Sequence, residues 1–363
     1  MYPNIAYKAL QKGDVVIFTN DYLDNSLVKR AITAEGQTVY INPDTGEVTV
    51  DSRLLDEKGT LQAGEDCIMS EQMNIQWYPG HMTKARRMIS DNAKIVDIIC
   101  EIIDARIPVS SQNPDIDDIA GAKARLIIIN RTDQADPEVT ERWGHYFADK
   151  GYGVMMADSQ SGKGVKVFSQ KVRSALREEI ASRRAKGQGG KALRAMIVGV
   201  PNVGKSSFIN RIAGRRAAEA SDRPGVTRGK QWIKIDNGLE LLDTPGILWP
   251  KFESQAVGEN LAFTGAVKDD VLDKETLGAN LMTRLALEYP ESIKTRYKFE
   301  PQRDKNGFEL LEQAARKRGF LISGGECDLE RMAGVLLDEF RGGKLGRISL
   351  EKPEDFQSPN ISE

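Results

Sequence analysis

A glycine-rich stretch that ends in lysine and serine is the part of the chain best suited to chemistry. It reads Gly199-Val-Pro-Asn-Val-Gly204-Lys205-Ser206 and lies between an apolar run and a helix-like segment. In such a context this spacing predicts a loop whose backbone N–H groups face phosphate oxygens. We expect Lys205 to reach the outer phosphates and the Ser206 hydroxyl to bind Mg²⁺. The residues expected around the phosphates are Asn202, Val203, Gly204, Lys205, Ser206 and Ser207.

A second phosphate element follows about forty residues later. In nucleotide-binding proteins of this type an acid that holds the metal follows the phosphate loop. Asp243-Thr-Pro-Gly246 ends an apolar run, so Asp243 is placed to hold Mg²⁺ through water and Gly246 to offer its N–H to a γ-phosphate. Thr227 lies between the two elements and could complete the metal shell when a triphosphate binds. A threonine after Pro-Gly is also a common turn residue, and only its position favours the metal role.

A candidate base-reading element precedes the phosphate loop. Arg125 and the apolar run 126–129 lead into Asn130-Arg131-Thr-Asp133, which is similar to the Asn-Lys-x-Asp element of GTPases. Asp133 would accept two hydrogen bonds from guanine that adenine cannot donate. Arg131 replaces the usual lysine, and this substitution bears on guanine affinity. Further on, Asp158 and Ser159 are similar to a second base-contacting loop. Taken alone, an Asn-x-x-Asp pattern is equally consistent with ordinary polar residues at a strand end.

The order of these elements carries the resemblance to a known family. The base element comes before the phosphate loop, and upstream stand Trp77-Tyr-Pro-Gly-His81-Met82 and Asp104-Ala-Arg-Ile-Pro108. From about residue 73 to 349 the chain resembles the circularly permuted GTPases of the ribosome biogenesis GTPase A family. The resemblance implies an α/β P-loop GTPase domain with a mostly parallel, doubly wound sheet and permuted motif order. It also implies a small α-helical C-terminal domain.

The same resemblance suggests how hydrolysis would proceed. Many GTPases orient the attacking water with a glutamine just after the Asp-x-x-Gly glycine, but here that position is Ile247. The resemblance therefore assigns the catalytic histidine to His81, with Lys205 and Thr227 as the other catalytic residues. It assigns to Asn202 a role in binding K⁺, so we expect K⁺ to stimulate turnover; a plain loop residue remains the alternative.

The function implied is that of a slow GTPase that binds GTP and GDP with Mg²⁺ and K⁺, as an assembly factor in late maturation of the large ribosomal subunit. Ribosomal RNA would be a partner, whereas neither DNA nor a membrane is expected. Two alternatives stay open. One is a nucleotide-gated RNA-binding scaffold with little hydrolysis, and the other is a permuted GTPase that acts on another RNA particle.

Composition and charge add the expected organisation. The 363 residues carry a net charge of −2, with no run of about 20 apolar residues and no secretory signal, which predicts a cytoplasmic protein. We expect a GTPase domain over 73–265, a helical and candidate RNA-binding domain over 266–350, and a disordered tail over 351–363. Residues 1–72 are acidic, and strand-like runs at 13–18 and 37–50 favour a small β-rich extension. The alternative is that translation starts at Met73.

Overall fold

The computed structural model describes short strands near the N-terminus and most of the chain from residue 80. The described ranges there are 80–214, 232–236, 238–249, 252, 254–269 and 272–356, with the backbone alone for residues 80 and 81. The chain divides into two compact units, Met1–Met69 and Ser70–Glu363. In the first unit β1 (Val15–Phe18) pairs with β2 (Leu27–Arg30), and β4 (Val48–Val50) pairs with both β3 (Val39–Ile41) and β5 (Arg53–Leu54), always antiparallel. The strands expected at 13–18 and 37–50 coincide with β1 and with the β3–β4 pair.

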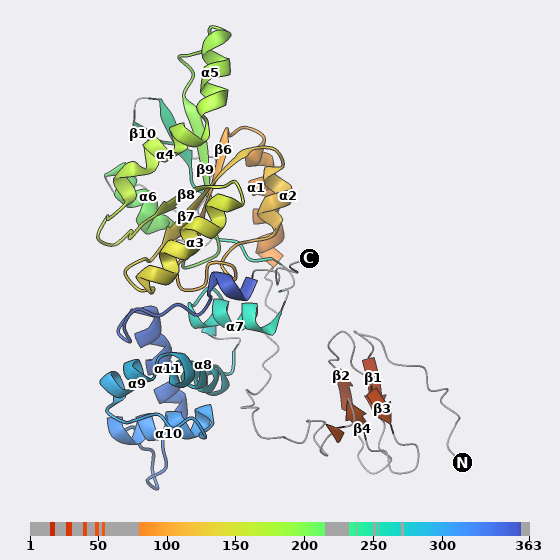
Figure 1. Ribbon diagram of the computed structural model, residues 1–363, viewed down its shortest axis with the longest axis vertical. Coiled ribbons are helices and arrows are strands. Elements are labelled where there is room, and N and C mark those ends of the chain that lie inside the picture. Colours follow the sequence, from red (N-terminus) through yellow and green to blue (C-terminus); the bar gives the residue numbers. More distant parts are fainter. Residues whose placement is uncertain are drawn as a thin grey trace, which may run out of the picture. The chain divides into compact units, whose positions relative to one another are not determined.

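A six-stranded sheet forms the centre of the second unit, in the order β10-β11-β9-β6-β7-β8 (Figure 1). Its strands are β6 (Ile98–Asp104), β7 (Ala124–Asn130), β8 (Gly153–Met156), β9 (Leu193–Val198), β10 (Trp232–Asp236) and β11 (Leu239–Leu242). All neighbours are parallel except the β10–β11 pair. Since ligands of such sheets bind at the carboxyl ends of the strands, β7 and β9 bring their following loops to one edge.

Helices cover both faces of this sheet. They are α1 (Gly80–Ala93), α2 (Asp115–Ala120), α3 (Pro137–Asp149), η1 (Val165–Val167), α4 (Phe168–Ala175), α5 (Arg177–Ala185) and α6 (Lys205–Ala213). On β6, Ile99 packs in one buried cluster with Ile89 of α1, whereas Ile98 packs in another with Phe168 and Phe208 of α4 and α6. Strands buried on both faces are typical of parallel sheets under helices. The predicted doubly wound, mostly parallel α/β sheet is confirmed.

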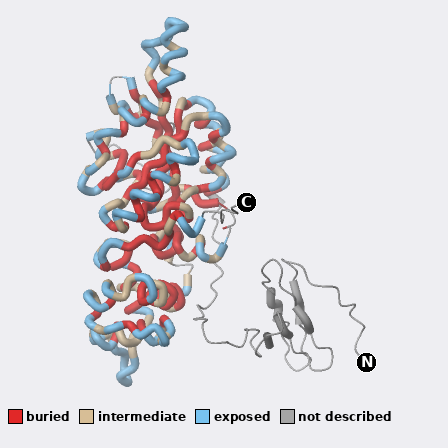
Figure 2. The backbone as a smooth tube through the Cα atoms, in the orientation of Figure 1, coloured by how far each residue is buried: buried red, intermediate tan, exposed pale blue. Residues whose placement is uncertain are grey.

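A group of helices follows the sheet along the chain, as expected from the sequence. They are α7 (Gln255–Phe263), α8 (Lys274–Glu288), α9 (Pro290–Tyr297), α10 (Gly307–Arg318), α11 (Leu329–Arg341) and the short η3 (Pro353–Phe356). The α8 helix packs against α10 and α11. Figure 2 shows buried residues where these helices meet. Asn306 starts α10 with a reciprocal cap to Glu309, which satisfies N–H groups that a helix start otherwise leaves unpaired. No helix in the described part of the chain has the length and apolar character needed to cross a bilayer.

Residues 348–352, called here the C-terminal strap, lead back from α11 to the sheet domain. The Ile348 N–H donates to Gln134 O at 2.9 Å, and the Leu350 N–H donates to Arg106 O at 2.8 Å. These bonds fasten the strap to the loops that follow β7 and β6. The strap is thus one of the connections between the helical region and the sheet domain.

The expectation that a disordered tail begins at residue 351 is wrong for residues 351–356. Glu351 is buried, with a Trp143 Nε1 to Glu351 O bond of 3.1 Å, and the Phe356 ring lies 5.7 Å from that of Trp143. A sequence of mostly polar residues gave no sign of these contacts, because Trp143 lies more than 200 residues away along the chain. The remainder of the expected tail, 357–363, lies outside the described residues.

Candidate functional site

The phosphate loop joins β9 to α6 through glycines that the local geometry requires. Gly199 and Gly204 have φ of 149° and 94°, which side-chain-bearing residues rarely adopt. A Cβ on Gly199 would lie 2.4 Å from Ile102 O, and one on Gly204 would lie 2.5 Å from Asn130 Nδ2. Both glycines therefore let the loop backbone approach its neighbours at the carboxyl edge of the sheet. The result is a curled backbone followed directly by a helix N-terminus, which is a favourable place for phosphate.

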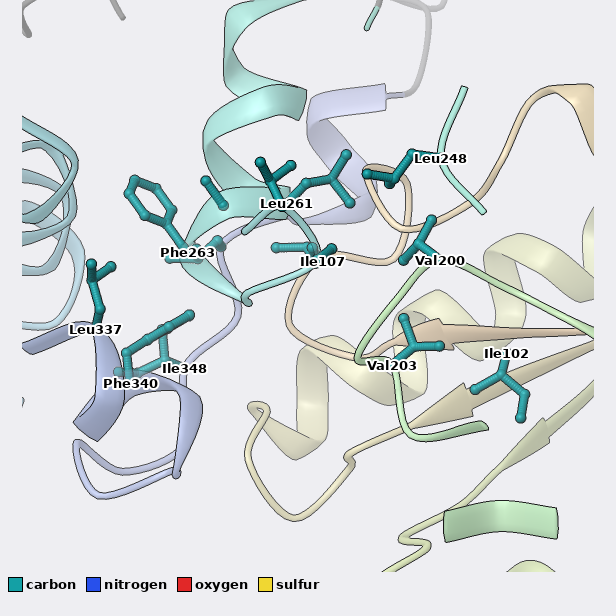
Figure 3. Close-up of a cluster of buried hydrophobic side chains, with 14 of the residues drawn as sticks. Ile102, Ile107, Val200, Val203, Leu248, Leu261, Phe263, Leu337, Phe340 and Ile348 are labelled. Carbon is teal, nitrogen blue, oxygen red and sulfur yellow. The ribbon is translucent and has the colours of Figure 1, made fainter. Parts of the chain in front are cut away.

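Two side chains of the loop point into the core and fix its shape. Val200 and Val203 pack with Ile102 and Ile107, as Figure 3 shows. Only 2% of Val203 is exposed. It follows that any contact of Val203 with a nucleotide comes from its backbone.

Lys205 is held over the loop. It is 8% exposed, and its Nζ donates to Gly199 O at 3.1 Å and to Val200 O at 2.9 Å. These carbonyl contacts place the ammonium at the centre of the curled backbone. Phosphate oxygens entering the loop would meet this positive charge. Ser206 is half-buried and Ser207 is exposed in the first turn of α6.

The second phosphate element lies against the first. β11 runs parallel to β9 with Leu242 opposite Met196, so Asp243 follows at the same edge as the phosphate loop. A Cβ on Gly246 would lie 2.8 Å from Lys205 Nζ and 2.9 Å from Pro201 N. Only glycine can therefore approach the loop this closely. The two elements therefore lie in contact at the carboxyl edge of the sheet.

The oxygen donors fit a magnesium ion that is completed by phosphate and water. Ser206 and the half-buried Asp243 are the described donors that the sequence assigned to the metal. No group of three or more His, Cys, Asp or Glu side chains in the described ranges could hold a metal ion by itself. Mg²⁺ in nucleotide sites is usually bound in this sparse way, with one or two protein oxygens and several phosphate or water ligands. Thr227, the third expected ligand, lies outside the described residues.

Asn130 connects the base element with the phosphate loop. Its Nδ2 donates to Val203 O at 2.7 Å, while its Oδ1 accepts from Ser159 Oγ at 2.7 Å. The side chain is 1% exposed, so both bonds are shielded from water. Asn130 therefore connects two loops of the site, and its expected role at the guanine base remains a prediction. Ser159 belongs to the same network.

The two acids of the base element have different environments. Asp133 is exposed, and partial loss of water together with the nearby Asp158 carboxylate raises the pKa of Asp133. Burial acts in the same direction on Asp158, but hydrogen bonds from Ser161 and from Gln160 N outweigh it and lower the pKa of Asp158. Asp158 therefore organises its own turn, whereas Asp133 presents its carboxylate at the surface where a base could bind.

Arg131 directs its guanidinium toward the phosphate loop and the helical region. Its φ is +60°, Nη2 donates to Asn202 O at 2.8 Å, and Nη1 lies 3.4 Å from Arg341 O. Burial lowers the pKa of Arg131, and the Asp104 carboxylate at 3.6 Å opposes that effect. The planar guanidinium makes these two contacts through separate nitrogens, whereas a lysine would have to make both from one ammonium. The substitution of the family lysine thus adds a link to the C-terminal end of α11.

Asn202 continues this link on the other side of a shallow hollow. Its φ is +62°, and its Nδ2 donates to Gly265 O just beyond α7. Arg131, Asn202, Lys268 and Arg341 line the hollow, whose volume is about 430 Å³. The amide nitrogen is engaged by Gly265, so the Asn202 oxygen is the atom left to contact a cation.

Sequence reasoning missed the structural role of Asp104 and Arg106, which it had used only as a family motif. The two side chains form a buried ion pair at 2.8 Å, and Arg106 Nη1 donates to Phe340 O at 3.0 Å. Arg106 also lies over the Phe340 ring, 4.9 Å from its centre. The motif therefore attaches the end of β6 to α11. Its spacing signals a charged pair, but nothing in the sequence signals the partner on α11.

His81 is the second residue of α1. Its side chain lies outside the described residues, so its expected catalytic role remains a prediction.

Comparisons with known proteins agree with this geometry. Residues 194–276 match the family model described as "50S ribosome-binding GTPase". The chain is 45% identical over 288 residues to "Ribosome biogenesis GTPase A" of Priestia megaterium, which covers 79% of this chain and 100% of that protein. A relative of the same name from Thermotoga maritima is 33% identical over 78% of this chain and 96% of its own length.

Solved structures of a related protein have the same fold. GNP-bound YlqF from T. maritima superimposes with a TM-score of 0.55 at 30% identity, covering 75% of this chain and 99% of that one. A GDP-bound YlqF structure gives a TM-score of 0.56 at 30% identity, over 74% of this chain and 100% of that one. With the permuted order of base element and phosphate loop, these matches show that the chain belongs to the ribosome biogenesis GTPase A family of GTP-hydrolysing enzymes.

Proposed function

We propose that this GTPase uses Mg²⁺ and acts in late maturation of the large ribosomal subunit. The observation that carries the nucleotide part is the bridge made by Asn130, which couples the phosphate loop to the second base loop. The ribosomal part is supported by the family description and by the names of the relatives.

In this proposal each site residue has one role. Asp133 reads guanine, Asn130 and Ser159 position the base loops, and Lys205 contacts the outer phosphates. Ser206, Thr227 and Asp243 hold Mg²⁺, which would supply positive charge where the phosphates become more negative. Gly246 offers its N–H to the γ-phosphate, because its lack of a Cβ lets it approach the loop.

The attacking water needs a group other than the residue after Gly246. Ile247 is 1% exposed and packs with Ile89 and Met196, so its side chain faces the core. An aliphatic group cannot orient water by hydrogen bonding in any case. We assign this role to His81, and we assign the Asn202 oxygen to K⁺.

The first experiment measures GTP turnover in K⁺ buffer, with ATP as the control nucleotide, in the presence and absence of large ribosomal subunits. GTP-selective turnover that rises with the particle supports the proposal. Tight GTP binding with negligible turnover in both conditions favours the nucleotide-gated scaffold, a reading that the buried Ile247 also permits. Co-sedimentation with a different RNA particle, but not with large-subunit precursors, would favour the other alternative.

The catalytic assignment has a matched control, because the chain contains two histidines. We expect His81→Ala to lower turnover by roughly 100-fold, the usual lower range for loss of a group that handles the proton. His145 is exposed on α3, and His145→Ala should leave turnover unchanged. Equal turnover in both variants would remove His81 from the mechanism. Replacement of K⁺ by Na⁺ without loss of turnover would remove the potassium role of Asn202.

A further inference from the structure

The α5 helix and the glycine-rich loop after it form a basic surface at the end of the sheet domain away from the phosphate loop. Between positions 168 and 194 the sequence has eight Lys and Arg residues but two acidic residues. None of the α5 residues is buried, and the helix extends outward from the sheet (Figures 1 and 2). We call this surface the basic pole and define it by Arg177, Arg184, Lys186, Lys191 and the loop 187–190.

The nucleotide site does not account for the basic pole. The loop enters β9 at Leu193, whereas the phosphate loop leaves β9 after Val198. A six-residue strand rises about 3.3 Å per residue, so these ends are on the order of 20 Å apart. At that distance salt screens most of the interaction between exposed charges and a bound nucleotide. Nucleotide binding therefore does not explain the positive charge at the pole.

Much of the charge at the pole is not neutralised within the protein. Arg173 pairs with Asp236 at 2.7 Å, and Arg183 pairs with Asp97 and Glu179. The four cations that define the pole are all exposed, and none of them has a carboxylate within 4 Å in the described part of the chain.

The basic clusters of the helical region are neutralised in part by their own acids, although Lys317 and Lys344 are exposed with no carboxylate within 4 Å in the described part of the chain. Arg316 pairs with Glu312 at 2.6 Å, and Arg318 pairs with Glu339 at 2.9 Å. Arg341 pairs with Asp269 at 2.7 Å. These arginines stabilise the protein's own helices, so the sequence clusters around them overstate the charge available to a partner. The basic pole keeps the charge that its sequence indicates.

The pole also has a hollow bordered by two glycines and by cations. A cavity of about 480 Å³ opens between α5 and the loop, bordered by Arg184, Gly189, Gly190 and Lys191. Neither the Gly189 N–H nor the Gly190 N–H donates to an acceptor within the described ranges. Exposed glycine N–H groups beside cations are well suited to oxyanions such as phosphate.

The composition of the pole favours RNA over an acidic protein. Segment 177–191 contains no aromatic residue and no methionine, which are enriched in the centres of protein interfaces. It also lacks the aromatic side chains on which unpaired bases stack. Lysine, arginine and backbone N–H groups are the usual contacts to the phosphate backbone, and such contacts carry no base sequence information.

We propose that the basic pole binds the phosphate backbone of RNA, without reading its sequence, and so forms a second contact with the ribosomal particle at the edge of the sheet opposite the nucleotide. This inference rests on the proposed ribosomal function. It also places an RNA contact on the sheet domain, outside the helical domain that the sequence favoured.

The test compares two triple variants that lose equal charge. The pole variant carries Arg184→Ala, Lys186→Ala and Lys191→Ala. The control carries Lys150→Ala, Lys166→Ala and Lys234→Ala, which are exposed residues of the sheet domain outside both the pole and the candidate RNA-binding helical region, with no carboxylate within ion-pair distance in the described part of the chain. Binding of the full chain to deproteinised RNA from large ribosomal subunits is measured over a range of KCl concentrations, together with GDP affinity.

We expect the pole variant to bind this RNA more weakly and with a salt dependence about two units shallower, since each lost phosphate contact removes about 0.7 to 0.9 from the slope of log affinity against log salt. Its GDP affinity should match the wild type. Wild-type affinity and slope in the pole variant overturn the inference while leaving the proposed function intact. Loss of binding to intact subunits with unchanged binding to bare RNA assigns the pole to an acidic protein and also overturns it. A wild-type chain that binds neither subunits nor RNA overturns both proposals.

Discussion

Asn130 is the residue on which the geometry of the nucleotide site depends most directly. Its amide donates to the phosphate loop and its oxygen accepts from Ser159. Asn130→Asp keeps the size but replaces the donor with an oxygen that faces Val203 O. Loss of a buried hydrogen bond that leaves its partner unpaired costs about 1 to 3 kcal/mol. We therefore expect GDP and GTP affinity to fall by roughly tenfold or more, measured by titration of a fluorescent nucleotide. Unchanged affinity would show that the bridge does not position the site.

The residues of the site differ in how far the sequence could predict them. Lys205 and Gly246 follow from local spacing, because the loop and the Asp-x-x-Gly turn are formed by consecutive residues. The contacts of Arg131 could not be predicted, since its guanidinium meets Arg341 O across 210 positions of sequence. Local patterns specify what a side chain can bind, whereas the fold decides which distant carbonyl it meets.

At the scale of elements, the packing of α8 on α11 depends on Gly278. A Cβ at this position would lie 2.5 Å from Ala333 Cβ and 2.9 Å from its Cα. Gly334 follows Ala333 on α11, and a Cβ built on Gly334 would have nothing within 4 Å. Alanine is favoured over glycine in a helix by about 1 kcal/mol. We expect Gly334→Ala to stabilise the protein by about that amount, and Gly278→Ala to destabilise it, in denaturant unfolding. Equal effects of the two changes would mean that the helices are not in close contact.

The helices α9, α10 and α11 also share one carboxylate. Burial alone would raise the pKa of Glu339, but hydrogen bonds from Arg296, Tyr297 and Arg318 hold that pKa at about 2. Because this pKa lies below the ordinary value of 4.5, the contribution of Glu339 to stability is present above pH 4.5 and is lost as the pH falls toward 2. Glu339→Gln should lower the melting temperature at pH 7 and reduce its fall between pH 5 and about pH 2.5. Thermal melts across that range would test this. If Glu339 does not contribute, the melting temperatures of the variant and the wild type will fall in parallel as the pH is lowered.

The secondary-structure elements themselves were largely predictable. Apolar runs marked the buried strands β7 and β9, and Asp243 and Asn130 marked the strand ends that meet at the site, whereas β6 was not predicted. The outward course of α5 was not predictable, because its charged residues are compatible with either a surface helix or a linker. Nor was the strap, whose backbone bonds to Gln134 and Arg106 involve no side-chain pattern.

At the scale of the whole molecule, the strap couples the helical region to the loops that carry the nucleotide site. Glu351 is 4% exposed, and its carboxylate accepts from Val109 N at 2.7 Å and from Ser110 N at 3.0 Å. Asn260 of α7 donates to the same carboxylate at 3.1 Å. One buried acid thus orders the loop after β6 and joins it to α7. Movement of that loop would be transmitted to the helices without passing through residues 243–254.

Removal of the Glu351 carboxylate should therefore weaken both regions together. Glu351→Ala leaves two backbone N–H groups unpaired in the interior, and we expect it to lower the melting temperature by several degrees, since each such group costs about 1 to 3 kcal/mol. Glu354 is a nearby control: it is exposed, and its ion pair with Arg142 at 2.9 Å lies on the surface. Surface pairs contribute about 0 to 1 kcal/mol, so Glu354→Ala should change the melt little. If the strap couples the two regions, Glu351→Ala also weakens GDP binding, because the loops at the ends of β6 and β7 lose a shared support. A fall in melting temperature with unchanged GDP affinity would limit the strap to stability alone.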